Sequence, residues 1–246
     1  MIAATKAEIR KLLTVRSTYI IFTLSVLLAV FFAFYADGLR AGQTVHDPSK
    51  LAGEVTSAIS AVALLGALVG VLLMTHEYRY NTIMYTLTSS RNRTRVLLAK
   101  IIAVSLFAVV FSLVLAVLSP SLAYLGIHVK GLHLVHQVFP VWSLLWRSIF
   151  VGWGFAMLGL LLSVIIRSQV GTIATLFLVP STVEQLLGLL LKKNAVYLPF
   201  TALDSVLQHN KELTAVSYGR VALIALIYIV VGWLIAWQLF LRRDAN

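Results

Sequence analysis

Long apolar runs alternate with short polar segments along the whole chain. A bilayer core of about 30 Å is crossed by roughly 20 apolar helical residues. The pattern therefore predicts an all-α polytopic membrane protein with six transmembrane helices, forming one transmembrane domain over residues 1–246. The six runs are Thr18–Tyr35, Thr56–Met74, Val96–Leu118, Leu144–Ile166, Val170–Leu191 and Val221–Leu241.

The segment before the first run mixes apolar and charged residues. Ile2, Ile9, Leu12 and Leu13 fall near one helical face, with basic and acidic residues between them. This spacing predicts that residues 1–17 form an amphipathic elbow helix lying along the membrane surface. A simple flank that anchors the first span is the alternative. The first run is too long for a cleaved signal peptide.

Composition supports the membrane assignment, because 60% of the residues are hydrophobic and only 12% are charged. The chain holds 20 Lys and Arg against 9 Asp and Glu. Twelve of the basic residues fall on the side of the membrane that holds both termini, and eight fall on the other. The positive-inside rule then predicts a multi-pass protein of the cell membrane with both termini in the cytoplasm. Topology and contact with anionic lipid headgroups account for the basic excess, so no nucleic-acid partner is expected.

The motifs of most enzymes are missing. No G-x-x-x-x-G-K-[ST] phosphate loop and no G-x-S-x-G elbow is present, and the chain has no cysteine. His76–Glu77 begins like the zinc motif H-E-x-x-H, but Tyr80 stands where the second histidine belongs. His128, His133 and His136 are read as polar loop residues rather than metal ligands. No catalytic, cofactor-binding or metal site is predicted.

The fifth run contains a proline and a buried acid. Pro180 predicts a break or hinge in this span, and Glu184 follows four residues later. A charge inside a bilayer costs about 2.5–3.5 kcal/mol on insertion scales, so such residues usually face a partner or a cavity. Glu184 is either a structural acid near the outer interface, capped by loop residues such as Lys192, or a candidate pathway residue.

Two further patterns in the spans leave alternatives open. Gly66 and Gly70 lie four residues apart, which favours close helix packing, either within the chain or between subunits. Aromatic side chains of the fourth run could line a transport route or form interfacial belts and packing contacts. They are Trp142, Trp146, Trp153 and Phe155.

The most informative polar segment is the loop over residues 75–95. It predicts a short helix at about Tyr78–Thr86, followed by a turn in which Ser89 or Ser90 caps the next helix. Arg91, Arg93 and Arg95 then lie near the positive end of that helix dipole. Lipid headgroups or an acidic partner surface must compensate for these charges.

The run E-Y-R-Y-N-T-I, continued by R-V-L-L-A-K, resembles the first cytoplasmic loop of ABC-2 type transporter permeases. Asn81 stands where that family usually has glycine. The elbow sequence A-E-I-R-K-L-L-T-V-R-S, the six spans without a nucleotide-binding domain, and Glu184 followed by Y-L-P-F are similar to the family too. The loop residues at matching positions are Glu77, Arg79, Thr82, Arg91 and Lys100.

The resemblance implies a permease subunit of an ATP-driven exporter. Its partners would be two separate ABC ATPase subunits, which bind the ATP, and a second permease copy or a sister permease. The exported compound would be amphipathic, such as a drug, an antimicrobial peptide or a lipid-like molecule. A non-transporting membrane scaffold or sensor is the alternative, and a membrane-embedded enzyme is a further one.

The same resemblance assigns the ATPase-coupling role to the loop. Its candidate residues are Glu77, Tyr78, Arg79, Tyr80, Thr82 and Arg91. Glu77 is expected to be an exposed charge, because nearby arginines already anchor the span. Its replacement by alanine is therefore expected to leave folding and insertion nearly intact.

Overall fold

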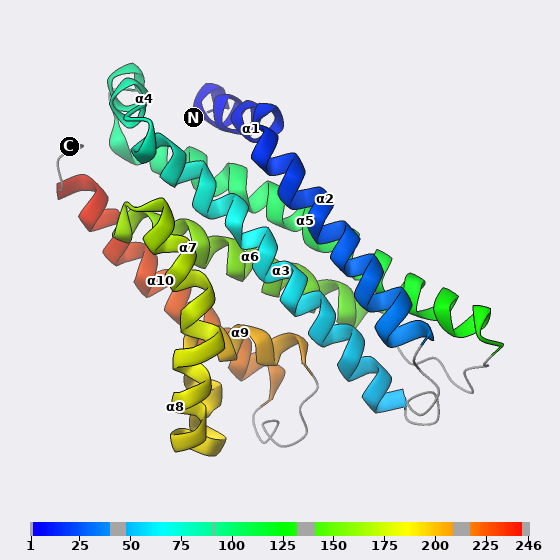
Figure 1. Cartoon of the computed structure of the whole chain (residues 1–246). Coiled ribbons are helices and arrows are strands. Elements are labelled where there is room, and N and C mark those ends of the chain that lie inside the picture. The colour runs from blue at the N-terminus through cyan, green and yellow to red at the C-terminus, as the bar shows by residue number, and fades with distance from the viewer. Residues whose placement is uncertain (1, 40–47, 91, 132–140, 209–216, 243–246) are drawn as a thin grey trace.

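The computed structural model describes residues 2–39, 48–90, 92–131, 141–208 and 217–242. These residues form helices joined by short turns, with no strand among them (Figure 1). Six of the helical segments are long and apolar enough to cross a membrane, which confirms the predicted fold class. They are Arg16–Tyr35, Ala52–Arg79, Arg93–Val129, Trp142–Ile166, Gln169–Tyr197 and Tyr218–Arg242.

Ten of the elements in the described part of the chain are α-helices. Segments η1 and η2 are π-helical and η3 is a 3-10 helix. In chain order the elements are α1 (Ile2–Thr14), α2 (Arg16–Val30), η1 (Phe31–Leu39), α3 (Pro48–Arg79), α4 (Ile83–Ser90), α5 (Arg93–Val129), α6 (Val141–Ile166), α7 (Gln169–Leu178), η2 (Val179–Val183), α8 (Glu184–Leu191), η3 (Lys192–Tyr197), α9 (Pro199–Leu207) and α10 (Tyr218–Arg242).

The predicted elbow helix is present as α1. It ends at Thr14, and the extended backbone of Val15 then turns the chain into the first span. Leu12 and Glu8 are its buried residues, whereas Ile2 and Leu13 are exposed. Ile9 is half-buried and packs against the core as well, so two apolar positions of the predicted face contact the bundle and the other two are exposed.

Helices α3, α5 and α6 form the centre of the bundle, and small residues let α3 and α6 approach closely. A Cβ added at Gly70 of α3 would stand 2.5 Å from the carbonyl oxygen of Ala156. A Cβ at Gly159 of α6 would stand 2.6 Å from the carbonyl oxygen of Ala67. The two backbones touch where neither glycine has a side chain, so Gly70 serves packing within the chain.

The break predicted in the fifth span is present. The helix widens into the π-helical turn Val179–Val183, which contains Pro180, a residue without a backbone N–H to donate. Beyond it, α8 diverges from the bundle (Figure 1). Its leucines are largely exposed, and α9 then packs back onto α6 and α10.

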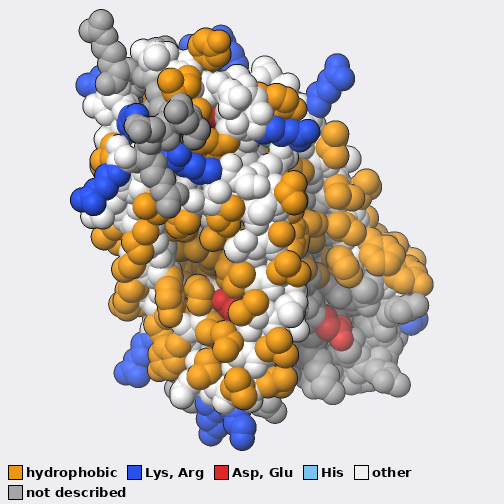
Figure 2. Space-filling view, turned by 60° about the vertical axis from the view of Figure 1, so that its left-hand side comes forward, with side chains coloured by type: hydrophobic (Ala, Val, Ile, Leu, Met, Phe, Trp, Pro, Cys, Tyr) orange, Lys and Arg blue, Asp and Glu red, His pale blue; other side chains and the backbone are white. Residues whose placement is uncertain are grey.

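The two ends of the bundle are polar and the middle is apolar. Figure 2 shows hydrophobic side chains over the middle of one face and Lys and Arg side chains toward its ends. Helix α4, helix α1 and the end of α10 lie at one end of the bundle (Figure 1). The first described helix and the last residues of α10 thus lie at the same end as α4, as an even number of spans requires.

Candidate functional site

The turn from α3 into α4 has a defined backbone structure. Thr82 N–H donates to the carbonyl of Glu77 at 3.0 Å, and Asn81 N–H donates to that of Tyr78 at 3.3 Å. Asn81 has a φ of 53°. This is a Schellman motif, in which asparagine takes the left-handed position that glycine usually fills. The turn explains how Asn81 replaces the glycine of the ABC-2 pattern.

Two local predictions for this loop are wrong. The short helix runs over Ile83–Ser90 rather than about Tyr78–Thr86, because α3 continues to Arg79 before it turns. The cap of the next helix is Asn92, whose side chain accepts from Arg95 N–H at 3.4 Å, whereas Ser89 and Ser90 belong to α4.

The charge of Arg93, in the first turn of α5, is compensated within the chain. The Arg93 guanidinium lies 3.5 Å from the carbonyl oxygen of Phe240 and 3.3 Å from that of Leu241. These carbonyls belong to the C-terminal end of α10, where the helix dipole is negative. Arg91 lies outside the described residues.

Glu77 is buried, with 5% of its surface exposed, so the expectation of an exposed charge is wrong. Its Oε1 lies 2.6 Å from Lys11 Nζ of α1 and 2.8 Å from Lys100 Nζ of α5. Glu8 pairs with the same two amines, at 2.8 Å from Lys11 and 2.9 Å from Lys100. We call Glu8, Lys11, Glu77 and Lys100 the ionic network.

The ionic network joins three helices at the end of the bundle that carries α4. Lys100 is 0% exposed and also donates to the carbonyl of Leu73 at 3.3 Å. Burial by itself lowers the pKa of the Lys11 amine, but hydrogen bonds to Glu77 and Glu8 outweigh it and raise that pKa. Removing one partner from a buried network costs about 3–5 kcal/mol, because it leaves an uncompensated charge. Glu77→Ala is therefore expected to destabilise the fold, contrary to the expectation from sequence.

A signal for this network was present in the sequence. Lys100 interrupts the apolar run V-L-L-A-K-I-I, and a charge at such a position usually pairs with another inside the membrane protein. Glu8 and Lys11 lie three residues apart on one helix, so their side chains are neighbours. The pairing across helices depended on the angle between α1 and α5, which no local pattern contains.

The other predicted coupling residues surround the network without joining it. Arg79 is exposed and donates to Gln169 Oε1 of α7 at 3.1 Å. The Arg167 guanidinium lies over the ring of half-buried Tyr78, 5.5 Å from its centroid. Tyr80 and Thr82 are exposed. Together these contacts tie the end of α3 to the turn between α6 and α7.

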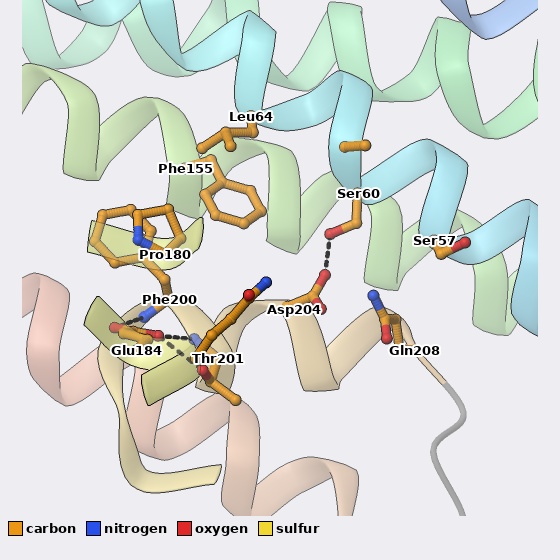
Figure 3. Close-up of a pocket in the computed structure, with 12 residues that line it drawn as sticks. Ser57, Ser60, Leu64, Phe155, Pro180, Glu184, Phe200, Thr201, Asp204 and Gln208 are labelled. Atoms are coloured by element: carbon orange, nitrogen blue, oxygen red, sulfur yellow. Dashed lines mark hydrogen bonds between the residues drawn. The ribbon is translucent and has the colours of Figure 1, made fainter. Parts of the chain in front are cut away.

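Glu184 is 4% exposed and caps a helix (Figure 3). Its Oε1 accepts from Phe200 N–H at 3.0 Å, and its Oε2 accepts from Thr201 N–H and Thr201 Oγ1, both at 2.7 Å. These are first-turn groups of α9, where Pro199 has no N–H to satisfy. The Y-L-P-F segment thus begins α9, and its backbone stabilises Glu184, whereas Lys192 is exposed.

Glu184 also lines a cavity of about 310 Å³. A second acid, Asp204 of α9, lines it too and accepts a hydrogen bond from Ser60 of α3 (Figure 3). We call this space the α9 cavity. Its lining residues are Ser57, Ser60, Ala61, Leu64, Phe155, Pro180, Glu184, Gln185, Phe200, Thr201, Asp204 and Gln208.

The cavity brings together residues that sequence reasoning treated separately. Phe155, one of the aromatics considered for a route, stacks on Phe200 at 6.2 Å between ring centroids. Burial raises the pKa of the Asp204 carboxyl; hydrogen bonds from Ser60 and Gln208 oppose this, and the charge of Glu184 adds to it. Asp204 was given no role from the sequence, because it lies outside the six apolar runs and its partner Ser60 belongs to another helix.

The chain was compared with known proteins. No curated protein matches it. The model of a family described as ABC-2 family transporter protein matches residues 4–181, which is more than two thirds of the chain. The matched residues include the ionic network and end before Glu184. The chain therefore belongs to the ABC-2 family of transporter membrane proteins.

Proposed function

We propose that this multi-pass transport subunit is the permease of an ATP-driven exporter in the cell membrane. It works with a second copy of itself or a sister permease, and with two separate ATPase subunits that bind and hydrolyse ATP. Both termini and α4 face the cytoplasm. The transported compound is amphipathic: a drug, an antimicrobial peptide or a lipid-like molecule.

The observation that carries this proposal is the two-sided character of the α3–α4 region. One side is exposed and apolar: Tyr85 is 77% exposed, and Tyr80 and Met84 are exposed as well. Apolar groups of this kind at the polar end of a membrane protein are typical of a surface that binds another protein. The other side is buried and ionic, because Glu77 at the end of α3 enters the network. We infer that an ATPase docks on α4.

The same region supplies a route for movement. Glu77 lies in the last turn of α3, and its carbonyl accepts the N–H of Thr82 that fixes the start of α4. A displacement of α4 by the ATPase pair acts on this turn and hence on the partners of Glu77 in α1 and α5. A space of about 630 Å³ beside the network, lined by Lys11, Glu77, Tyr85 and residues of α2, leaves room for such movement.

The test uses Tyr85→Ala in a tagged permease expressed in its native host. The side chain is exposed, so this variant is expected to insert and fold normally, while co-purification of an ATPase falls at least about tenfold, as for a central interface aromatic. Trp142→Ala is the matched control, because Trp142 is also largely exposed but lies at the start of α6, at the opposite end of the bundle. It is expected to keep the ATPase.

Three outcomes would count against the proposal or part of it. If neither the unmodified permease nor the control retains an ATPase, the transport role fails. If an ATPase is retained but no ATP-dependent transport occurs in vesicles, the scaffold or sensor alternative is favoured. Equal retention by Tyr85→Ala and the unmodified chain would place the docking surface elsewhere.

A further inference from the structure

Two acidic side chains line the α9 cavity, and no basic ones do among the residues that the structure describes. Among the described residues, Glu184 receives hydrogen bonds from two backbone N–H groups and a hydroxyl, and Asp204 receives them from Ser60 and Gln208. Within the described part of the chain, neither acid forms an ion pair, and no Lys, Arg or His is among the residues that line the cavity. Neutral dipoles make these acids tolerable inside the protein without cancelling their charge.

The remaining walls are apolar and aromatic. Phe155 and Phe200 stack on one another, and Leu64 and Pro180 lie beside them (Figure 3). Aromatic faces attract cations through the ring quadrupole, and desolvation strengthens that attraction. A ligand with a positive group and an apolar body therefore satisfies both kinds of wall, whereas an anion would meet the carboxylates unfavourably.

The size and position of the cavity limit what enters it. Its volume of about 310 Å³ is at the low end of the 300–1,000 Å³ typical of small-molecule sites. It is bounded by α3, α6, the π-helical turn of the fifth span, α8 and α9. The space suits a head group and a short apolar portion rather than a whole peptide.

We propose that the α9 cavity is a binding site for the cationic group, such as an alkylammonium, of an amphipathic compound. Asp204 and Glu184 supply the counter-charge, and Phe155 and Phe200 contact the adjoining apolar part. That this compound is the one transported rests on the proposed function. Ser57, Gln185 and Gln208 offer hydrogen-bonding groups at the polar side of the cavity.

The chain has no cysteine, so a single introduced one reports on the cavity. Ser57→Cys is placed in its wall, and the purified permease is reconstituted in nanodiscs, which expose both faces of the membrane. Rates are measured with methanethiosulfonates that carry a trimethylammonium, a neutral methyl or a sulfonate group. For each variant, the rate with the cationic reagent is divided by the rate with the anionic reagent, and the result is divided by the same ratio for free cysteine. This corrected ratio is expected to be at least about tenfold higher for Ser57→Cys than for Ser121→Cys, because nearby carboxylates attract the cationic reagent and repel the anionic one.

Asp204→Asn in the Ser57→Cys background is the charge control. Asparagine keeps an oxygen that accepts from Ser60 and removes only the charge, so it is expected to lower the ratio toward that of Ser121→Cys. Ser121 is a matched position, since it is an exposed helical serine whose hydroxyl also bonds to a carbonyl of its own helix. Glu184→Gln also removes a charge and is expected to lower the same rate ratio, but it weakens the cap of α9 as well.

Binding is measured by protection of the same cysteine from the neutral reagent. Hexyltrimethylammonium is expected to slow modification severalfold in the Ser57→Cys protein, and much less in Ser57→Cys with Asp204→Asn. Hexyl sulfate, with the same tail, is expected to give no protection. A ratio equal to that of Ser121→Cys, or equal protection by the two detergent-like probes, would overturn the proposal.

These measurements need no ATPase, so they separate the two proposals. If the cavity prefers cations but no ATPase binds the permease, the binding-site proposal holds and the transport proposal fails. If ATPase-dependent transport occurs but the cavity shows no cation preference, the transport proposal holds and the binding-site proposal fails.

Discussion

The two buried acids that matter most, Glu77 and Glu184, are accommodated in opposite ways. Glu77 lies between two lysines from other helices, at 2.6 Å and 2.8 Å. Glu184 meets no lysine or arginine among the described residues and is held by the first turn of α9. Each arrangement offsets the free-energy cost of an ionised carboxyl group inside a membrane protein.

The difference separates a structural joint from a binding site. In the ionic network the charges cancel inside the chain, and each of α1, α3 and α5 supplies at least one member, so the helices are fixed relative to one another. In the α9 cavity the charges are stabilised but not cancelled, so an incoming cation still gains energy there. The contrast predicts different responses to the removal of each charge.

Removing the charge of Lys100 from the ionic network is expected to have the largest effect on stability. Lys100→Met leaves Glu8 and Glu77 buried with a single shared amine and should lower the free energy of unfolding by about 3–5 kcal/mol. Thermal unfolding of the purified protein in nanodiscs is the measurement. Arg79→Met is the control, since Arg79 is exposed and its contacts are worth about 0–1 kcal/mol. Similar losses for the two variants would show that the network is not the joint.

Glu184 tests the cavity end, with a smaller effect. Glu184→Ala removes an acceptor from two backbone N–H groups and a hydroxyl, and should destabilise α9 by about 1.5–3 kcal/mol. Hydrogen exchange should become faster in Pro199–Leu207 and remain unchanged in α5. Glu184→Gln retains one acceptor oxygen and should be milder. Faster exchange throughout the bundle would mean that Glu184 supports more than α9.

Asp204 should respond least, and in the opposite direction. Because burial raises the pKa of its carboxyl, the folded chain binds this proton more tightly than the unfolded chain. Stability from this group is therefore present below the ordinary aspartate pKa and is lost as the pH rises through the raised pKa. Glu184 is the other titratable group that lines the cavity, while Ser57 and Ser60 of α3 and Phe155 of α6 carry no charge.

Asp204→Asn should thus change stability near neutral pH by no more than about 1 kcal/mol, and toward greater stability. The difference between variant and unmodified protein should shrink on acidification. Thermal unfolding at several pH values between 4 and 8 measures it, and the subtraction removes contributions that the two proteins share. A variant that is less stable at every pH would show that the charge of Asp204 is needed for folding.

Local patterns predicted the helices of this chain but not its ion pairs. Apolar run length located all six spans, and Pro180 located the break in the fifth, because both effects act within about one turn of helix. Glu77 was recognised as a notable residue yet misplaced on the surface, since its burial depends on Lys11 and Lys100 arriving from other helices. No role was predicted for Asp204 for the same reason, because its partner Ser60 lies in another helix, α3.

The central claim is that an ATPase docked on α4 drives a permease whose compound binds in the α9 cavity. The most direct measurement is the reactivity of Ser57→Cys toward the neutral thiosulfonate in the reconstituted permease–ATPase complex, with and without ATP. ATP is expected to change this rate severalfold, and Tyr85→Ala is expected to abolish the change. An unchanged rate while the ATPase remains bound and hydrolyses ATP would contradict the account.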